Sequence, residues 1–235
     1  MSYTAAIQQW DTDFFQLNIS RVDPKGLTNV EFVQLQTELR QNEIELAYIV
    51  VEDDDIGSLN TLQGLSPIDV KVTLSIDTSS SLFQPSSHIS RYTGNVDPRL
   101  YELALIAGGF SRFKLDNNFP VGSFEALYRR WIEKETADEA NTFVWVCHIG
   151  IEFAGFISVT IKDGTPSISL IATNKKQQVK GIGRALIHHS LHHLAQNGYS
   201  KCTVSTQEDN RGAMAFYKAL GFNVIHKQYY YHLWL

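Results

Sequence analysis

Apolar positions in the second half of the chain predict a regular succession of strands and helices. Alternating or short apolar runs that end in turn residues predict strands, and apolar residues at helical spacing predict helices. The predicted elements are a helix at Ser123–Lys134 with Ser123 as its N-cap, strands at Phe143–Ile149, Phe153–Ile161 and Ser167–Thr173, a helix ending near Gly198, a strand at Lys201–Gln207, a helix at Asn210–Leu220 and a strand from Val224 to Tyr231. This order is typical of an α+β fold with a mixed sheet.

The first hundred residues show the same kind of pattern. The predicted elements are a strand at Phe14–Val22, a helix from Thr28 to about Gln41, a strand at Glu45–Val51, a weaker helix ending near Gly64 and a strand at Val70–Asp77. Thr28 and Glu31 have the spacing of a capping box, in which each side chain accepts a hydrogen bond from the other residue's backbone amide. This part of the chain is therefore expected to fold as a smaller α/β domain.

A polar connector separates the two parts. Residues 79–87 are rich in serine and contain Pro85, a composition typical of linkers. We predict an N-terminal domain at residues 1–98 and a second domain at residues 99–235. Leu62–Ile68 and Ala219–Ile225 share the succession of helix end, glycine, apolar residue and strand. Either the N-terminal domain is a degenerate copy of the second one, or the likeness arises by chance, because this succession is common.

Composition restricts the class of protein. The 235 residues, 43% of them hydrophobic, suffice for one large core or two smaller ones. The chain has no apolar run of about 18 residues and no signal-peptide pattern, so we expect a cytoplasmic protein without a membrane span. Cys147 and Cys202 stand in apolar strands and are expected to be buried free thiols. The net charge is −5, and the sequence has no basic stripe interleaved with aromatic residues. We therefore expect that the protein does not bind nucleic acid.

A glycine-containing loop follows the strand Ser167–Thr173 and opens the next helix. Gln178–Arg184 reads Q-V-K-G-I-G-R, and Gly181 and Gly183 allow a close backbone approach to an anion at the positive end of the helix dipole. Four basic residues stand in or beside the loop: Lys175, Lys176, Lys180 and Arg184. The spacing matches neither the Walker loop nor the dinucleotide fingerprint. The loop therefore predicts a ligand that carries a pyrophosphate or a similar group.

A second motif lies downstream, where Asn210–Phe222 reads N-R-G-A-M-A-F-Y-K-A-L-G-F. By itself this segment is an amphipathic helix that Asn210 caps and Gly221 ends, with Tyr217 in the core. Together with Q-x-x-G-x-G, it resembles the cofactor site of the GCN5-related N-acetyltransferases, the GNAT family. The resemblance implies a GNAT fold for the second domain and acetyl-coenzyme A as the acetyl donor, with no metal.

The resemblance also implies roles for individual residues. Acyl transfer to an amine requires a polarised carbonyl and a proton for the departing thiolate. The backbone amide of Ile171 or of a neighbour is expected to polarise the carbonyl, Tyr217 to protonate the sulfur and Asn210 to orient the cofactor. The implied cofactor-binding residues are Leu170, Ile171, Ala172, Thr173, Gln178, Val179, Lys180, Gly181, Ile182, Gly183, Arg184, Asn210, Ala213, Phe216 and Tyr217.

Neither a general base nor a metal site stands out. Residues near the predicted strands that could remove a proton are expected to be ordinary exposed side chains, namely Glu152, Glu208, Asp209 and His148. A chain of water could serve instead. Histidines at i,i+4 spacing can share a metal, and two such pairs are present: His188 with His192, and His189 with His193. They lie off the apolar stripe without an H-E-x-x-H motif, so we expect surface residues.

A narrower resemblance extends over nearly the whole chain. The segments that carry it are Trp10–Phe15, Lys71–Leu74, Ala107–Asp116 with Phe119, Leu127–Ile132 and Tyr231–Leu235. They resemble the dTDP-fucosamine (dTDP-4-amino-4,6-dideoxygalactose) N-acetyltransferases. This implies a nucleotide-sugar substrate bound on the side of the N-terminal domain, acetylation of its amine and a role in polysaccharide biosynthesis. At 115–118 the chain reads L-D-N-N where that group usually has a proline-containing turn, which affects the local loop shape.

One segment between the predicted domains is the candidate substrate site. The guanidinium of Arg112 could bind a diphosphate through two hydrogen bonds, while Phe110 or Phe113 packs on a base or sugar. The alternative is that Arg112 only packs between the domains. Two other functions stay open: acetylation of another small amine or protein N-terminus, and non-catalytic binding of acyl-coenzyme A. The oligomeric state is open as well, with a homodimer as one option.

Overall fold

A ten-stranded mixed sheet runs through the whole molecule in the order β1-β2-β3-β10-β4-β9-β8-β7-β6-β5. The computed structural model describes residues 2–78, 86–174 and 181–235. The elements are β1 (Tyr3–Ile7), α1 (Gln9–Phe15), β2 (Ile19–Pro24), α2 (Asn29–Gln41), β3 (Leu46–Glu52), α3 (Ile56–Thr61), β4 (Asp69–Asp77), β5 (Ile89–Arg91), α4 (Pro98–Ala107), α5 (Arg112–Leu115), α6 (Ser123–Ala137), β6 (Thr142–Ile149), β7 (Glu152–Lys162), β8 (Thr165–Thr173), α7 (Ile182–Gln196), β9 (Lys201–Gln207), α8 (Arg211–Ala219) and β10 (Asn223–Trp234). The predicted α+β class with a mixed sheet is confirmed.

The element order predicted for the second half is also confirmed, with β6, β7 and β8 forming an antiparallel meander before α7. Two predictions were wrong. Phe14 and Phe15 belong to helix α1 and not to a strand: the Phe15 ring packs against Phe113 and Phe119, and the Phe14 ring stacks on that of Trp10, one helical turn earlier. Ser123 is not an N-cap, because α6 begins after Gly122, whose φ is +86°, without any side-chain cap.

Five of the described elements had no counterpart in the sequence prediction: β1, α1, β5, α4 and α5. β5 contributes only three residues, Ile89–Arg91, and pairs with β6 beyond the polar connector. The predicted domain boundary at residue 98 stays a prediction, since β4 and β5 both precede it yet join the sheet beside strands of the second half.

The same succession of elements occurs twice in the chain. Apart from α1, which lies between β1 and β2, the elements β1, β2, α2, β3, α3 and β4 follow one another as β7, β8, α7, β9, α8 and β10 do. In each copy the first two strands pair antiparallel and the second and third pair in parallel. The last strand of each copy pairs with the third strand of the other copy, β10 with β3 and β4 with β9. The two halves therefore exchange their last strands.

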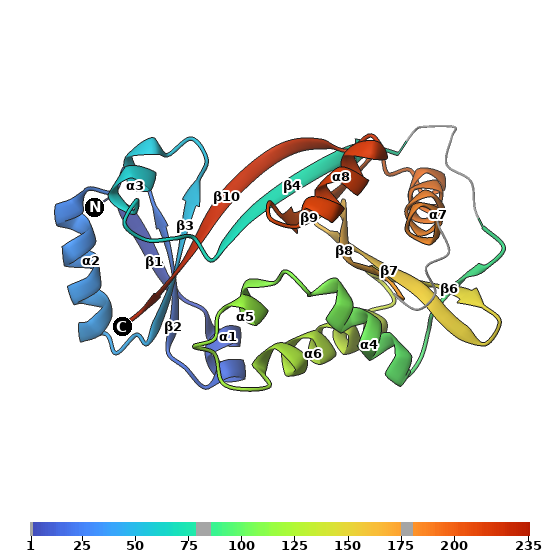
Figure 1. The fold of residues 1–235 in the computed structure, drawn as a ribbon, viewed down its shortest axis with the longest axis horizontal. Coiled ribbons are helices and arrows are strands. Elements are labelled where there is room, and N and C mark those ends of the chain that lie inside the picture. The colour runs from blue at the N-terminus through green and yellow to red at the C-terminus, as the bar shows by residue number, and fades with distance from the viewer. Residues whose placement is uncertain (1, 79–85, 175–180) are drawn as a thin grey trace.

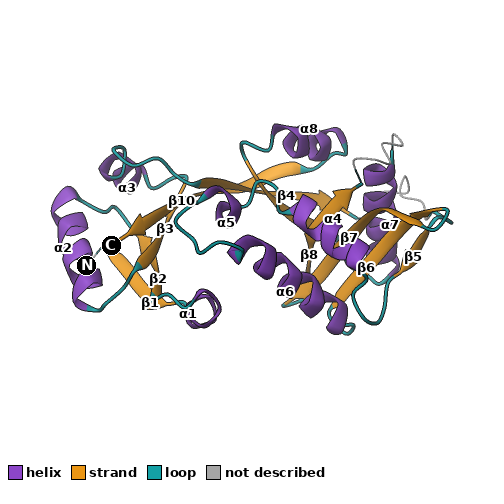
Figure 2. Cartoon of the chain, turned by 60° about the horizontal axis from the view of Figure 1, so that its bottom comes forward, coloured by secondary structure: helices purple, strands orange, loops and turns teal. Residues whose placement is uncertain are grey.

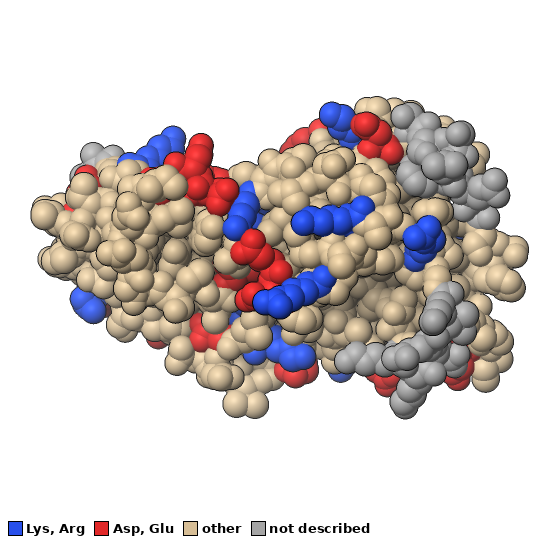
Figure 3. Space-filling view, turned by 45° about the horizontal axis from the view of Figure 1, so that its top comes forward, with Lys and Arg blue, Asp and Glu red and all other residues tan. Residues whose placement is uncertain are grey.

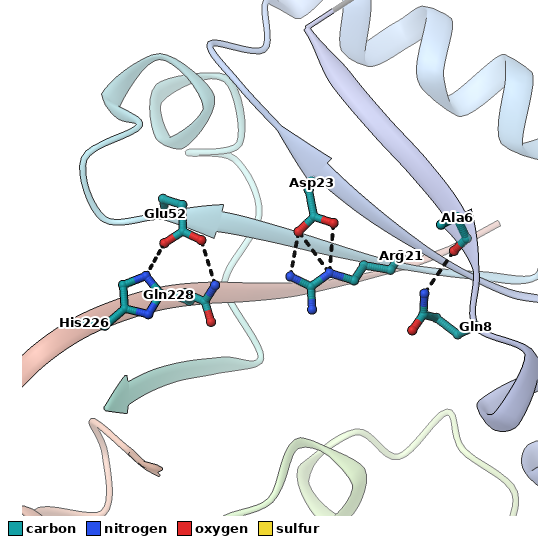
Figure 4. Close-up of polar contacts among 7 residues, drawn as sticks. All are labelled: Ala6, Gln8, Arg21, Asp23, Glu52, His226 and Gln228. Atoms are coloured by element: carbon teal, nitrogen blue, oxygen red, sulfur yellow. Dashed lines mark hydrogen bonds and ion pairs between the residues drawn. The ribbon is translucent and has the colours of Figure 1, made fainter. Parts of the chain in front are cut away.

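The exchanged strands meet in the middle of the sheet. β4 and β10 pair antiparallel along the seam between the halves, and Figure 1 shows them as the two long strands that cross from one half to the other. Because β10 crosses over, the C-terminus lies beside the N-terminal half (Figure 1). Glu52 of β3 fastens β10 there: its carboxylate accepts hydrogen bonds from Gln228 Nε2 at 2.7 Å and from the His226 ring (Figure 4).

Helices cover both faces of the sheet and enclose three clusters of buried apolar side chains. α2 and α3 cover one face of the N-terminal half, and α7 and α8 cover one face of the other half. The remaining helices gather on the opposite face (Figure 2), where a single cluster includes Phe15, Tyr48 and Tyr230 together with Leu127 and Phe156. This cluster contains buried residues of both halves, so the halves share a core on that face.

None of the helices within residues 2–78, 86–174 and 181–235 combines the length and the apolar character that crossing a bilayer requires. Cys147 and Cys202 are buried free thiols, as predicted. Burial raises the pKa of the Cys202 thiol to about 12, which keeps it protonated and unreactive at neutral pH.

The predicted capping box at α2 is present. Thr28 Oγ1 accepts a hydrogen bond from Glu31 N at 3.3 Å, and Glu31 Oε2 accepts one from Thr28 N at 3.1 Å. We expect Thr28→Ala to lower the free energy of unfolding by about 1 kcal/mol, because an orphan amide of the first turn loses its acceptor. Urea unfolding measures the change. Thr37→Ala in the same helix is the matched control, and an equal loss there would contradict the capping role.

Candidate active site

Strands β8 and β9 run in parallel and then separate, which opens the sheet. The register pairs Ser167 with Thr203 and Ile168 with Val204, after which the strands diverge. A cavity of about 1370 Å³ begins at this opening and is lined by Ser169–Ile171 on one strand and Ser205–Gln207 on the other. This volume exceeds that of a site for one drug-sized ligand, which spans about 300–1,000 Å³. The cavity therefore has room for two reactants.

The N-terminus of α7 has no side-chain cap among the described residues. Gly181, the N-cap residue, has a φ of +106° and no side chain that could bond to the amides of the first turn. A Cβ on Gly181 would meet nothing within 4 Å, whereas one on Gly183 would lie 3.2 Å from Phe216 Cζ. The first glycine supplies backbone freedom and the second allows close packing against α8. This geometry fits an anion at the helix N-terminus; Gln178, Val179 and Lys180 lie outside the described residues.

The equivalent helix of the other half is closed to anions. Its first turn is already capped by Thr28 and Glu31, and hydrogen bonds from Ser2 and Thr28 lower the pKa of Glu31 to about 2. The amide of the preceding Gly26 donates to the carboxylate of Asp55. Because carboxylates of the chain hold these amides, a pyrophosphate has no place at α2.

Helix α8 carries the second motif beside the same opening. The side chain of Asn210 caps the helix by accepting a hydrogen bond from Ala213 N at 3.2 Å, and Asn210, Ala213 and Tyr217 all line the cavity. Tyr217 is 3% exposed and its ring contacts those of Phe216 and Phe222. Burial raises the pKa of Tyr217 well above its ordinary value, so the phenol stays protonated throughout the neutral range.

The remaining predicted cofactor residues follow the same edge. Leu170 and Ile171 line the cavity, whereas Ala172 and Ile182 are buried and Thr173 and Arg184 are exposed. The structure thus brings together the described residues of both motifs, although they lie on three different elements, β8, α7 and α8.

A β-bulge in β8 determines which amides face the opening. The pairing of β7 with β8 shifts register between Ser158 and Val159. At this point Leu170 N donates to Ser158 Oγ at 3.2 Å, and the Ser158 hydroxyl donates to the buried carboxylate of Glu135. Glu135 also accepts from Trp131 Nε1 at 2.8 Å. The amide of Leu170 is therefore occupied, which leaves Ile171 as the predicted carbonyl-polarising amide.

Glu135 and Ser158 were missed by the sequence analysis. Glu135 is 6% exposed, and desolvation raises the pKa of its carboxyl group. The signal was present, since Glu135 follows Trp131 by four residues on the buried side of α6, where a charged residue is costly unless it has partners.

The other end of the cavity lies between the two halves. Arg112 and Phe113 line it, as do Trp10 and Asp11 of α1 and Asp69 of β4. The exposed fraction of Phe110 is 42%, and it is not among the described residues that line the cavity. Two of the three predicted substrate residues thus line the cavity, and the roles of all three stay predictions.

Acidic side chains flank Arg112. Desolvation raises the pKa values of Asp11 and Asp69, and the charge of Arg112 opposes both shifts. The earlier candidates for a base, Glu152, Glu208, Asp209 and His148, are not among the described lining residues, while Asp11 and Asp69 are. The sequence spacing of Asp11 and Asp69 does not distinguish them, because they approach Arg112 only in the folded chain.

The histidines of α7 pack against an aromatic strand. The rings of His189 and His193 contact that of Trp145, with centroids 5.8 Å and 5.2 Å apart. They are half-buried, so the prediction of surface residues was only partly right, and desolvation lowers the pKa values of both imidazoles. Within the described ranges, no group of three or more His, Cys, Asp or Glu side chains is placed to hold a metal.

Comparison with known proteins agrees with this geometry. Residues 111–222 match the model of the acetyltransferase (GNAT) family. A 62-residue segment, 26% of this chain, is 36% identical to the [ribosomal protein bS18]-alanine N-acetyltransferase of Escherichia coli strain K12, of which it covers 42%. The matched segments span less than half the length of the curated relatives.

Solved structures show the same fold over nearly the whole chain. A GCN5-related N-acetyltransferase from Sphaerobacter thermophilus superposes with a TM-score of 0.67 at 15% identity, covering 99% of this chain and 76% of that one. A tandem GNAT protein from the clavulanic acid biosynthesis pathway superposes with a TM-score of 0.58 at 14% identity, covering 92% and 75%. These matches agree with the duplicated succession of elements. The segment that matches the GNAT family model, residues 111–222, contains β8, β9 and the opening between them, and the solved structures share its fold.

Proposed function

We propose that this protein transfers an acetyl group from acetyl-coenzyme A to an amine held in the cavity between its halves. One observation carries the proposal: residues of β8, β9 and α8, among them Tyr217, line one cavity where β8 and β9 separate, and Gly183 at the start of α7 packs against Phe216 of α8. The first-turn amides of α7 suit the cofactor's pyrophosphate. The closed N-terminus of α2 supports a single cofactor site in the described chain.

The residues of the opening meet the needs of acyl transfer. Negative charge develops on the thioester oxygen, and the backbone amide of Ile171, a residue that lines the cavity, is the donor expected to stabilise it. The departing thiolate takes a proton, which Tyr217 supplies in this proposal.

Because burial raises the pKa of Tyr217, its acid form persists through the alkaline range. We therefore expect no loss of turnover near pH 10, where an ordinary phenol would ionise.

For the acceptor we propose a dTDP-linked amino-deoxy sugar. The cavity of about 1370 Å³ has the volume for a second ligand, and basic side chains of Lys71, Arg130 and Lys134 line it. These charges suit a diphosphate. Basic and acidic side chains lie close together on the face shown in Figure 3, so the described surface there offers no broad cationic field. In this proposal the positive charge that binds the nucleotide diphosphate comes from the basic side chains that line the cavity.

A thiol-release assay tests activity and substrate together. Acetyl-coenzyme A is offered with dTDP- and UDP-linked amino sugars, with other small amines, and with a peptide bearing an N-terminal alanine, the amine named for the E. coli relative. We expect saturable thiol release with a dTDP-linked amino sugar. Saturation only with the peptide would replace the sugar by a protein substrate, and no release with any amine would contradict transferase activity.

Replacement of Tyr217 by Phe tests the general acid. We expect turnover to fall by about 10²- to 10⁴-fold, because the thiolate loses its proton donor, with little change in acetyl-coenzyme A binding. Steady-state kinetics and calorimetric titration measure the two effects. Tyr199→Phe, in the same core cluster, is the matched control. Unchanged turnover in the Tyr217 variant would remove the assignment.

Replacement of Ser158 by Ala tests the bulge. Loss of the hydroxyl leaves Leu170 N without its acceptor and frees the neighbouring amide of Ile171 to turn. We expect kcat to fall by up to about 10²-fold, the lower end of the cost of deleting an oxyanion donor, while KM for acetyl-coenzyme A stays the same. Ser190→Ala removes another fully buried hydroxyl, which bonds only within α7, and is the control. A matching fall in kcat there would indicate a general loss of stability instead.

A further inference from the structure

Four buried polar atoms without hydrogen-bond partners gather at the seam between the halves. Five such side-chain atoms occur in the described part of the chain, and these four are Tyr48 Oη, Asp69 Oδ1, Arg112 Nε and His232 Nε2. Buried polar groups are nearly always hydrogen-bonded, and each exception needs an explanation. Their accumulation in one place indicates that something else supplies the missing partners.

The four side chains form one cluster. The guanidinium carbon of Arg112 lies 5.3 Å from the Tyr48 ring centroid and 4.7 Å from that of Tyr230. The Tyr48 and His232 rings are 5.0 Å apart, and Asp69 pairs with Tyr230 across the exchanged strands. Asp69 and Arg112 line the end of the cavity that lies between the two halves. Tyr48 lies directly beside Arg112, and His232 lies beside Tyr48, although neither is among the described residues that line the cavity.

The chemistry of the orphan atoms is mixed. His232 Nδ1 lies 2.6 Å from Asp116 Oδ2, which also accepts from Trp234 Nε1 at 2.9 Å. Because burial lowers the pKa of His232 to about 4, its ring is neutral. The neutral ring donates through Nδ1 and leaves Nε2 as an acceptor. Asp69 Oδ1 is a second acceptor, Arg112 Nε is a donor, and the Tyr48 hydroxyl is both.

This mixture discriminates between ligand chemistries. A diphosphate offers only acceptors, so it leaves Asp69 and His232 unsatisfied and meets repulsion from the carboxylates of Asp69 and Asp11. An ammonium group offers only donors, and it meets the positive charge of Arg112. A hydroxyl group both donates and accepts and carries no charge. Of the three, hydroxyls alone match the cluster.

We propose that Tyr48, Asp69 and Arg112 form a subsite for the hydroxyl groups of a sugar-like ring, completed by β4 and β10 exchanged between the halves. The inference rests on the proposed function for the position of the reacting amine, which must reach the opening between β8 and β9. It places the ring at the seam and assigns the diphosphate to the basic residues elsewhere in the cavity. Arg112 thus binds the ring rather than the diphosphate.

Replacement of Tyr48 by Phe gives the sharpest test. It deletes a buried hydroxyl that has no partner in the free protein, so we expect Tm to stay the same or rise, because an unsatisfied buried group costs stability. Affinity for an amine-free dTDP-hexose such as dTDP-galactose, measured by calorimetry without acetyl transfer, is expected to fall about 2- to 10-fold, the equivalent of one hydrogen bond. Affinity for dTDP alone is expected to remain unchanged.

Asp69→Asn is a second test by the same calorimetry. We expect it to weaken the affinity for dTDP-hexose and to leave the affinity for dTDP unchanged. Tyr231→Phe and Asp77→Asn are the controls: Tyr231 packs in the cluster on the opposite sheet face and Asp77 is exposed at the far end of β4. Equal weakening of dTDP and dTDP-hexose by Asp69→Asn would place the nucleotide at the seam and overturn the inference. A lower Tm of Tyr48→Phe with unchanged ring affinity would show a structural role and also overturn it.

A further probe separates this inference from the proposed function. Methyl fucopyranoside carries the ring without nucleotide or amine, and saturation-transfer NMR detects its binding at millimolar concentration. We expect binding to the wild-type protein that Tyr48→Phe weakens. Thiol release with some amine, combined with no ring binding by either probe, would keep the transferase and reject the subsite. Ring binding without any thiol release would keep the subsite and reject the transferase.

Discussion

The antiparallel pairing of β4 with β10 is the contact on which the rest of the molecule depends. Each strand is the last element of one repeated unit and is held between strands of the other unit. Neither half can complete its sheet alone, because each would leave the edges of β3 or β9 unpaired. The exchange also brings Asp69 and Tyr230, from strands far apart in the chain, opposite each other at the seam. A single shared core on one sheet face follows from it.

The two halves show how one topology can be open or closed to an anion. Both contain a parallel strand, helix, strand unit whose helix N-terminus points its amides outward. In the N-terminal half Glu31 and Asp55 occupy those amides, and β2 and β3 stay paired over four residues from Ile19 to Val22. In the other half Gly181 stands where a capping side chain would be, and β8 and β9 separate after Ile168. Local side chains, and not the fold, decide where a cofactor can bind.

The buried carboxylate of Glu135 links the helical layer to the chemistry. It holds Ser158, and Ser158 holds Leu170 N within the bulge of β8. A polar network in the core costs desolvation, which its hydrogen bonds offset only when every member is satisfied. Here the network has its partners, and the next residue along β8, Ile171, lines the cavity. The seam cluster differs, because its polar atoms lack partners within the chain.

The sequence by itself determined the local elements and the cofactor side of the site. Apolar periodicity, the capping box at Thr28 and the glycines of the two motifs act over a few residues, so β6 to β10, α2, α7 and α8 were predictable from neighbours in the chain. The helix at Phe15 was not, since its ring packs against Phe113 and Phe119, which are distant in the chain. Only the tertiary structure decided the strand exchange, the partners of Glu135 and the cluster around Arg112. Those features depend on contacts between residues distant in the chain, which no local pattern records.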